Sequence, residues 1–136
     1  MEYLVDANVL SERTRQLPSK PVSDWLSRHE TELAINPVIL GELEYGILVL
    51  PSGRRRTRLL EWFEHGVAHL HVLDFDRETA RIWATLLAGL QRKGRAMPVK
   101  DSLIAATALQ YELALATRNT SDYRHTGVRL VNPFES

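Results

Sequence analysis

The sequence predicts an α/β protein, a three-layer α/β/α sandwich around a central, mainly parallel sheet of four to five strands. Short apolar runs of strand character alternate along the chain with longer segments whose apolar residues recur at helical spacing. No repeat or low-complexity tract interrupts this alternation, and 136 residues suffice for one domain with a substantial core. We therefore expect a single domain over residues 1–136, with helices on both faces of the sheet.

Five strands and five main helices are expected. The strands are EYLV (2–5), ELAI (32–35), HLHVLDF (69–75), LALAT (113–117) and VRLV (128–131). The helices are PVSDWLSRHE (21–30), NPVILGELEYGILVL (36–50), RRRTRLLEWFEHG (54–66), DRETARIWATLLAGLQRKG (76–94) and DSLIAATALQY (101–111). Asn36 is a plausible N-cap before Pro37, Asp76 can cap the next-to-last helix, and Gly66 ends the third.

Composition excludes several classes of function. The 17 basic and 17 acidic residues balance, so no overall charge directs the protein to nucleic acid or to a membrane surface. Cysteine is absent, which rules out a disulfide framework and a thiolate metal site. The first residues lack the regions of a secretory signal, and no apolar run approaches the roughly 18 residues of a membrane-spanning helix. We expect a cytoplasmic protein without membrane contact.

Acidic residues occur where the expected strands end or helices begin. Asp6 follows the first strand, Glu42 lies in the second helix, Asp101 starts the alanine-rich helix, and Asn119 and Asp122 follow the fourth strand. Each has a structural explanation when taken alone. Asp6 and Asp101 can cap helices, Glu42 can be solvated or paired with a cation, and the last two are ordinary turn residues.

Taken together, these positions favour a metal site. Ligands of parallel sheets gather outside the carboxyl ends of the strands, where all these side chains are expected to converge. Several carboxylates do not stay ionised side by side without a cation between them. Hard divalent ions such as Mg²⁺ take oxygen ligands and activate water for phosphodiester hydrolysis. The sequence therefore predicts metal-dependent phosphoryl chemistry.

Four motifs, LVDANVLSE, GELEYGI, VKDSLIAATAL and LATRNTSDY, resemble in order and spacing those of PIN-domain ribonucleases. Within that superfamily the chain resembles VapC-type toxins of bacterial toxin–antitoxin pairs, including the FitB-like group. The resemblance implies that Asp6, Glu42 and Asp101 hold Mg²⁺ or Mn²⁺. Asp122 is expected as the fourth acid, with Asn119 as a neutral ligand or water-positioning group.

The resemblance also implies an activity and partners. Water activated at the metal would attack the RNA phosphorus in line and leave a 5′-phosphate and a 3′-hydroxyl. A homodimer and a cognate VapB-like antitoxin, in a complex of unspecified size, are expected.

Further substrate contacts are expected from the amide, hydroxyl and basic groups near the acids. The residues are Asn8, Thr117, Arg118, Arg54 and Arg58. For the basic run that contains Arg54 and Arg58, a solvated helix face or a surface for an acidic partner segment is an equal alternative. Two other functions stay open, namely a non-catalytic PIN-like module that binds RNA or protein, and a DNA-directed metal nuclease.

Overall fold

A five-stranded sheet forms the centre of the computed structural model, which describes residues 1–135. Every neighbouring pair of strands is parallel. In the spatial order β3-β2-β1-β4-β5, the strands are β3 (His71–Val72), β2 (Leu33–Ile35), β1 (Tyr3–Val5), β4 (Ala114–Ala116) and β5 (Leu130–Val131). The prediction of an α/β fold with a parallel central sheet is confirmed.

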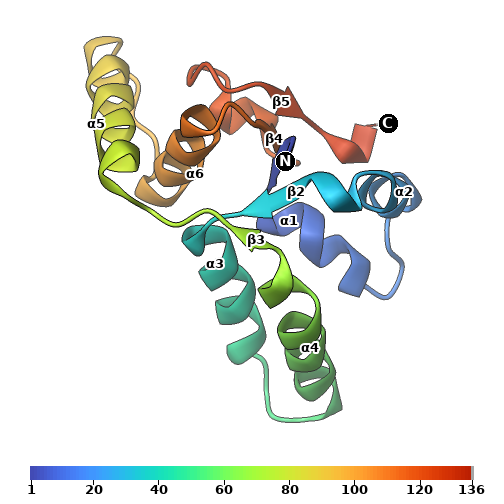
Figure 1. The fold of residues 1–136 in the computed structure, drawn as a ribbon. Helices are drawn as coiled ribbons and strands as arrows, with labels where there is room; N and C mark the ends of the chain where they lie inside the picture. The colour runs from blue at the N-terminus through green and yellow to red at the C-terminus, as the bar shows by residue number, and fades with distance from the viewer. Residues whose placement is uncertain (136) are drawn as a thin grey trace.

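Helices connect the strands within residues 1–135. They are α1 (Ala7–Leu10), α2 (Lys20–Arg28), α3 (Pro37–Leu48), α4 (Arg54–His65), α5 (Arg77–Arg92) and α6 (Val99–Gln110). Single 3₁₀ turns lie between them, including η1 (Ser11–Thr14), η3 (Val67–His69) and η4 (Thr120–Tyr123). The α3–α4 pair and the α5–α6 pair extend from different sides of the sheet (Figure 1). In the described part of the chain, no helix has the length and apolar character needed to cross a bilayer.

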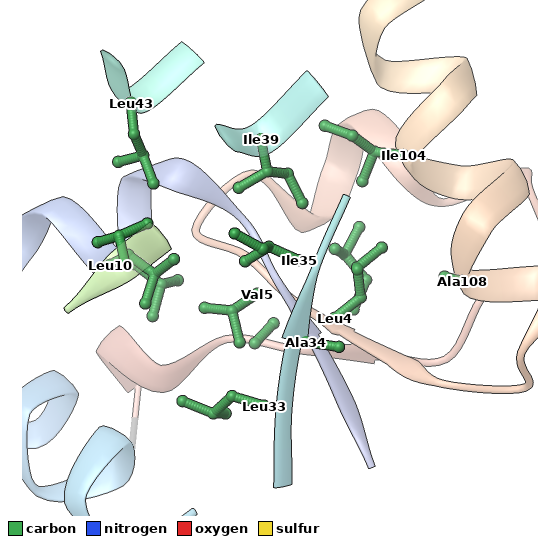
Figure 2. Packing of buried hydrophobic residues seen from close by; sticks show 14 of the residues in the cluster. Leu4, Val5, Leu10, Leu33, Ala34, Ile35, Ile39, Leu43, Ile104 and Ala108 are labelled. Carbon is green, nitrogen blue, oxygen red and sulfur yellow. The ribbon is translucent and has the colours of Figure 1, made fainter. Parts of the chain in front are cut away.

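The central strands β2, β1 and β4 are largely buried, whereas the edge strands β3 and β5 are half-buried or exposed. Leu4, Val5, Ile35 and Leu115 are completely buried, as expected for the interior of a parallel sheet covered by helices. Side chains from α3 and α6 pack against them, with Ile39 and Ile104 among those in Figure 2. β3 is shorter than the predicted strand 69–75, because η3 occupies the chain up to His69 and β3 pairs only with β2.

Two helix starts are as the sequence predicts, and one is not. Asn36 caps α3 by accepting the Ile39 N–H at 2.9 Å, and Asp76 forms a capping box at α5. The alternative explanation of Asp101 as an N-cap does not hold. Helix α6 begins earlier, at Val99 after Pro98, and Asp101 lies within its first turn. The fixed φ of Pro98 brings the chain into the helix without a side-chain cap.

The strand order changes direction at β1. From β1 the chain moves outward through β2 to β3, and then returns to place β4 on the other side of β1. Val5 of β1 lies beside Ala116 of β4, so the residues that follow them, Asp6 and Thr117, leave the same edge of the sheet together. Such a point of reversal is where open α/β sheets bind ligands.

Replacing Asn36 with alanine should lower the free energy of unfolding by about 2–3 kcal/mol, as measured by urea denaturation. Asn36 is completely buried, and besides capping α3 it donates to the Thr107 hydroxyl of α6 at 3.1 Å. Ser19→Ala removes the longer, 3.5 Å cap of α2 and should cost under about 1 kcal/mol. Equal losses in the two variants would contradict a structural role for the bond between α3 and α6.

Candidate metal centre

Asp6 lies at the carboxyl end of β1 with only 7% of its surface exposed. Its side chain accepts the Ala7 N–H at 2.8 Å and the Thr117 hydroxyl at 2.8 Å. The first bond caps α1, and the second joins the ends of β1 and β4. Capping and a place in the candidate site are therefore compatible for this carboxylate.

Asn8 connects the same two strand ends. Its amide nitrogen lies 3.4 Å from both Asp6 Oδ2 and Thr117 Oγ1, and its amide oxygen accepts the Arg118 N–H at 3.0 Å. Thr117, which is completely buried, also accepts the Asn119 N–H at 3.1 Å. These contacts hold Asp6 in one orientation.

Glu42 approaches from α3, the helix that Asn36 starts at the carboxyl end of β2. Its side chain is 32% exposed, and Glu42 Oε2 lies 3.5 Å from Lys100 Nζ. Pairing with a cation is one of the explanations of Glu42 that the sequence leaves open, and Lys100 provides such a pair. The ammonium group comes from the first turn of α6, next to Asp101.

Asp101 is held by a tyrosine of η4. The Tyr123 hydroxyl donates to Asp101 Oδ1 at 3.3 Å, and Tyr123 is only 1% exposed. Burial, with the charges of Asp6 and Asp101 next in importance, raises the pKa of Tyr123 far above its usual value. The hydroxyl therefore stays protonated and keeps its role as a donor.

Charge interactions link the three carboxylates. Burial raises the pKa of Asp6, and the charge of Asp101 raises it further against the opposing hydrogen bonds from Thr117 and Ala7. Burial likewise raises the pKa of Glu42, as do the charges of Asp6 and Asp101, while Lys100 lowers it. Bringing these charges together is unfavourable without a cation.

The two candidates for the fourth position are both on the surface. Asn119 and Asp122 are exposed, and the Asp122 N–H donates to the Asn119 carbonyl at 3.1 Å within η4. The Asp122 carboxylate makes no hydrogen bond or ion pair within residues 1–135. Asp6, Glu42 and Asp101 are thus near enough for their charges to interact, and Asp122 lies in η4.

The three arginines predicted to contact the substrate lie in different surroundings. The Arg118 guanidinium lies over the Phe134 ring at 4.6 Å from its centroid, and this stacking directs it to the C-terminal turn. Arg58 lines a hollow beside α4 together with Arg55, whereas Arg54 is absent from the lining of that hollow. The helix places Arg55 one turn before Leu59, on the side that faces η1.

The donor set fits a hard divalent cation. All three converging side chains are carboxylates, and two of them have raised pKa values that a bound cation would lower. Within residues 1–135, however, no three histidine, aspartate or glutamate side chains are close enough to form a preassembled ligand cluster. Like charges that repel one another are expected to close around an ion only when it binds.

Three residues of this region lie outside the sequence prediction. Lys100 directly precedes Asp101, and Tyr123 directly follows Asp122. This proximity in sequence to predicted site residues was the signal that could have identified them. Arg55 belongs to the same basic run as the predicted Arg54 and Arg58, and only the phase of α4 distinguishes it.

Comparison with known proteins gives matches along nearly the whole chain. The PIN domain family model matches residues 3–128. VapC ribonuclease Y4jK of Sinorhizobium fredii is 32% identical over 97% of each chain.

Two solved structures extend the comparison. The crystal structure of FitAcB from Neisseria gonorrhoeae superimposes with a TM-score of 0.91 at 30% identity, over 98% of this chain and 99% of the other. VapBC-5 from Mycobacterium tuberculosis, a member of the VapBC family of toxin-antitoxin systems, gives a TM-score of 0.71 at 27% identity, over 97% and 99%. The match of sequence and fold along nearly the whole chain shows that this protein belongs to the PIN-domain family.

Proposed function

We propose that this protein is a divalent-metal-dependent endoribonuclease and the toxin of a toxin–antitoxin pair. The observation that carries the proposal is the convergence of Asp6, Glu42 and Asp101 where the strand order reverses, with two of the three pKa values raised by burial and mutual charge. The similarity to a VapC ribonuclease supports RNA as the substrate.

Asp6, Glu42 and Asp101 would hold Mg²⁺ or Mn²⁺, with Asp122 as a fourth acid from η4. When bound, the ion supplies Lewis acidity that activates water and offsets negative charge on the phosphoryl group. Nothing in this chemistry requires the ribose 2′-hydroxyl as the nucleophile. The expected products therefore carry a 5′-phosphate and a 3′-hydroxyl.

The surrounding residues orient the carboxylates. Thr117 and the Ala7 N–H fix the two oxygens of Asp6, and the Asn8 amide lies beside Thr117. Tyr123 fixes one oxygen of Asp101 from a buried position. Such preorganisation lowers the cost of assembling the site around an ion.

Lys100 has a second role in this proposal. Its side chain is 66% exposed, so the ammonium group is free to turn from Glu42 to a phosphoryl oxygen of the substrate. It would neutralise part of the Glu42 charge before metal and RNA bind, and would stabilise negative charge on the phosphate afterwards.

The toxin assignment rests on the similarity to VapBC-5, a toxin–antitoxin system, and on the resemblance to VapC toxins. We further propose one PIN domain over residues 1–136, a homodimer, and a cognate VapB-like antitoxin. The expected location is the cytoplasm, where the RNA substrate is.

Purified protein should cleave RNA with Mg²⁺ or Mn²⁺, and EDTA should abolish the cleavage. Asp6→Asn and Asp101→Asn should each lower the rate at least about 100-fold, because each removes a charged ligand of the ion. Asp74→Asn, which changes an exposed loop carboxylate, is the matched control and should keep full activity. The measurement is the initial rate on an end-labelled RNA, with analysis of the product ends.

Cleavage that persists in both variants and in the presence of EDTA would contradict the metal-dependent mechanism. RNA binding without cleavage under any metal condition would instead indicate a non-catalytic module. Preferential cleavage of a DNA strand of the same sequence would reassign the substrate.

Substitutions in η4 separate the two candidates for the fourth position. If Asp122 is the fourth acid, Asp122→Asn should lower the cleavage rate more than Asn119→Ala, since it removes a negative charge that helps hold the ion. The same ranking is expected for Mn²⁺ affinity measured by isothermal titration calorimetry. The opposite ranking in both measurements would assign the position to Asn119.

The raised pKa of Asp6 predicts a stability profile for the metal-free protein. A carboxyl whose pKa is raised by folding contributes stability that is complete below its ordinary value of 3.8 and is lost as pH rises through the raised value. The thermal midpoint should therefore fall between pH 4 and pH 8 more steeply in the natural protein than in Asp6→Asn. A shift of about 4 °C corresponds to each kcal/mol in a domain of this size.

Mg²⁺ at pH 8 should raise the midpoint of the natural protein and raise that of Asp6→Asn much less, because the ion binds the folded carboxylates. Asp74→Asn serves again as the control and should follow the natural profile. Parallel pH profiles for the natural protein and Asp6→Asn would contradict a raised pKa of Asp6 in the folded protein.

A further inference from the structure

Two adjoining hollows lie beside the candidate metal centre. A hollow of about 270 Å³ is lined in part by Glu42 and Asn8. A second hollow of about 610 Å³ adjoins it, because the two share Thr14, Arg55, Leu59 and Trp62 in their linings. The larger hollow, here called the arginine groove, is lined by Arg13, Thr14, Arg15, Gln16, Arg55, Arg58, Leu59 and Trp62.

The lining of the arginine groove is strongly cationic. It contains four arginines and no carboxylate, in a chain whose formal charges sum to zero. Arg55 and Arg58 are exposed and form no ion pair within residues 1–135. Their guanidinium groups, one from each of two neighbouring turns of α4, are therefore available to an anion.

The opposite wall of the groove is fixed in place. Arg13 of η1 donates to the Ser27 hydroxyl at 2.9 Å and to the Ser23 carbonyl at 3.2 Å, which anchors it to α2. Arg15 lies 3.7 Å from the buried carboxylate of Glu12 and keeps 64% of its side chain exposed. The two walls present positive charge toward the space between them.

Trp62 adds a flat aromatic surface. It is half-buried against the core and takes part in the lining of both hollows, one turn after Arg58. Single-stranded nucleic acids are bound by this combination of a cationic groove that follows the phosphates and aromatic side chains on which bases stack. The arginine groove adjoins the smaller hollow that Glu42 and Asn8 line, and for cleavage one phosphate of the same strand would have to lie at the candidate metal centre.

We propose that the arginine groove binds the single-stranded RNA segment adjacent to the cleaved bond. Arg55 and Arg58 contact its phosphates, and Trp62 stacks on a base. This inference rests on the proposed ribonuclease function. It adds the direction in which the RNA strand extends from the candidate metal centre. An acidic protein segment is the competing occupant. RNA is favoured because it offers regularly spaced phosphates to the arginines and also bases that can stack on Trp62.

The test measures binding separately from cleavage. The probe is a fluorescein-labelled, unstructured 12-nucleotide RNA, titrated by anisotropy in the Asp6→Asn background so that the strand stays intact. The double variant Arg55→Gln, Arg58→Gln should weaken binding about tenfold or more. The slope of log affinity against log salt concentration should become shallower by about one to two, which corresponds to the loss of one to two phosphate contacts. Arg77→Gln with Arg81→Gln on α5 removes the same charge elsewhere and should change affinity less than about twofold.

Trp62→Phe keeps an aromatic ring of smaller size and tests the stacking contact. RNA should quench tryptophan fluorescence in the Asp6→Asn protein, and Trp62→Phe should remove most of that quenching while circular dichroism shows an unchanged fold. Quenching that persists in Trp62→Phe would overturn the assignment of the stacking surface.

The outcomes separate this inference from the proposed function. Equal RNA affinity of the groove variant and the α5 control, or no detectable RNA binding, would overturn the groove assignment even if the natural protein cleaves RNA. Selective loss in the groove variant would support the groove even if no cleavage is found. Loss of binding to a polyglutamate peptide, with RNA affinity unchanged, would assign the groove to a protein partner.

Discussion

The parallel pairing of β1 with β4 is the constraint on which the rest of the site depends. Val5 and Ala116 lie opposite each other, so Asp6 and Thr117 emerge side by side although 111 positions separate them in the chain. The Thr117 hydroxyl then donates to Asp6 at 2.8 Å in a buried position. A shift of one residue in this pairing would turn Asp6 to the other face of the sheet.

The site places charges where they are unfavourable for the metal-free fold. Asp6 is nearly inaccessible to solvent, and the charge of Asp101 raises its pKa further. The charges of Asp6 and Asp101 in turn raise the pKa of Glu42. Lys100 and Tyr123 reduce this cost, the first by an ion pair with Glu42 and the second by a hydrogen bond to Asp101. A bound cation, as proposed above, would relieve the remaining repulsion between the carboxylates.

Charges of opposite sign are separated along one surface path. The carboxylates lie at the carboxyl edge of the sheet, and the arginines lie between η1 and α4, with Arg55 bordering both hollows. The overall charge of zero hides this separation. A polyanion bound along the path would meet arginines in the groove and a cation at the carboxylates, so both ends of the path suit phosphates once the ion is present.

Local sequence determined the elements and several of their ends. The alternation of apolar runs and helical periods predicted all five strands, and Asn36 and Asp76 cap the helices for which they were predicted. These features depend on neighbours within a few residues, which the sequence contains directly. Local reasoning failed at Asp101, because Pro98 already supplied the backbone conformation needed to start α6 two residues earlier.

Only the tertiary structure decided which side chains meet. The sequence allowed a cation beside Glu42 but did not identify Lys100. In the basic run it named Arg54 and Arg58, whereas Arg55 and Arg58 line the groove. Tyr123 became a partner of Asp101 because η4 packs against α6. Such contacts join segments that strand order and helix phase bring together. Since both depend on how the whole core packs, no local pattern in the sequence specifies them.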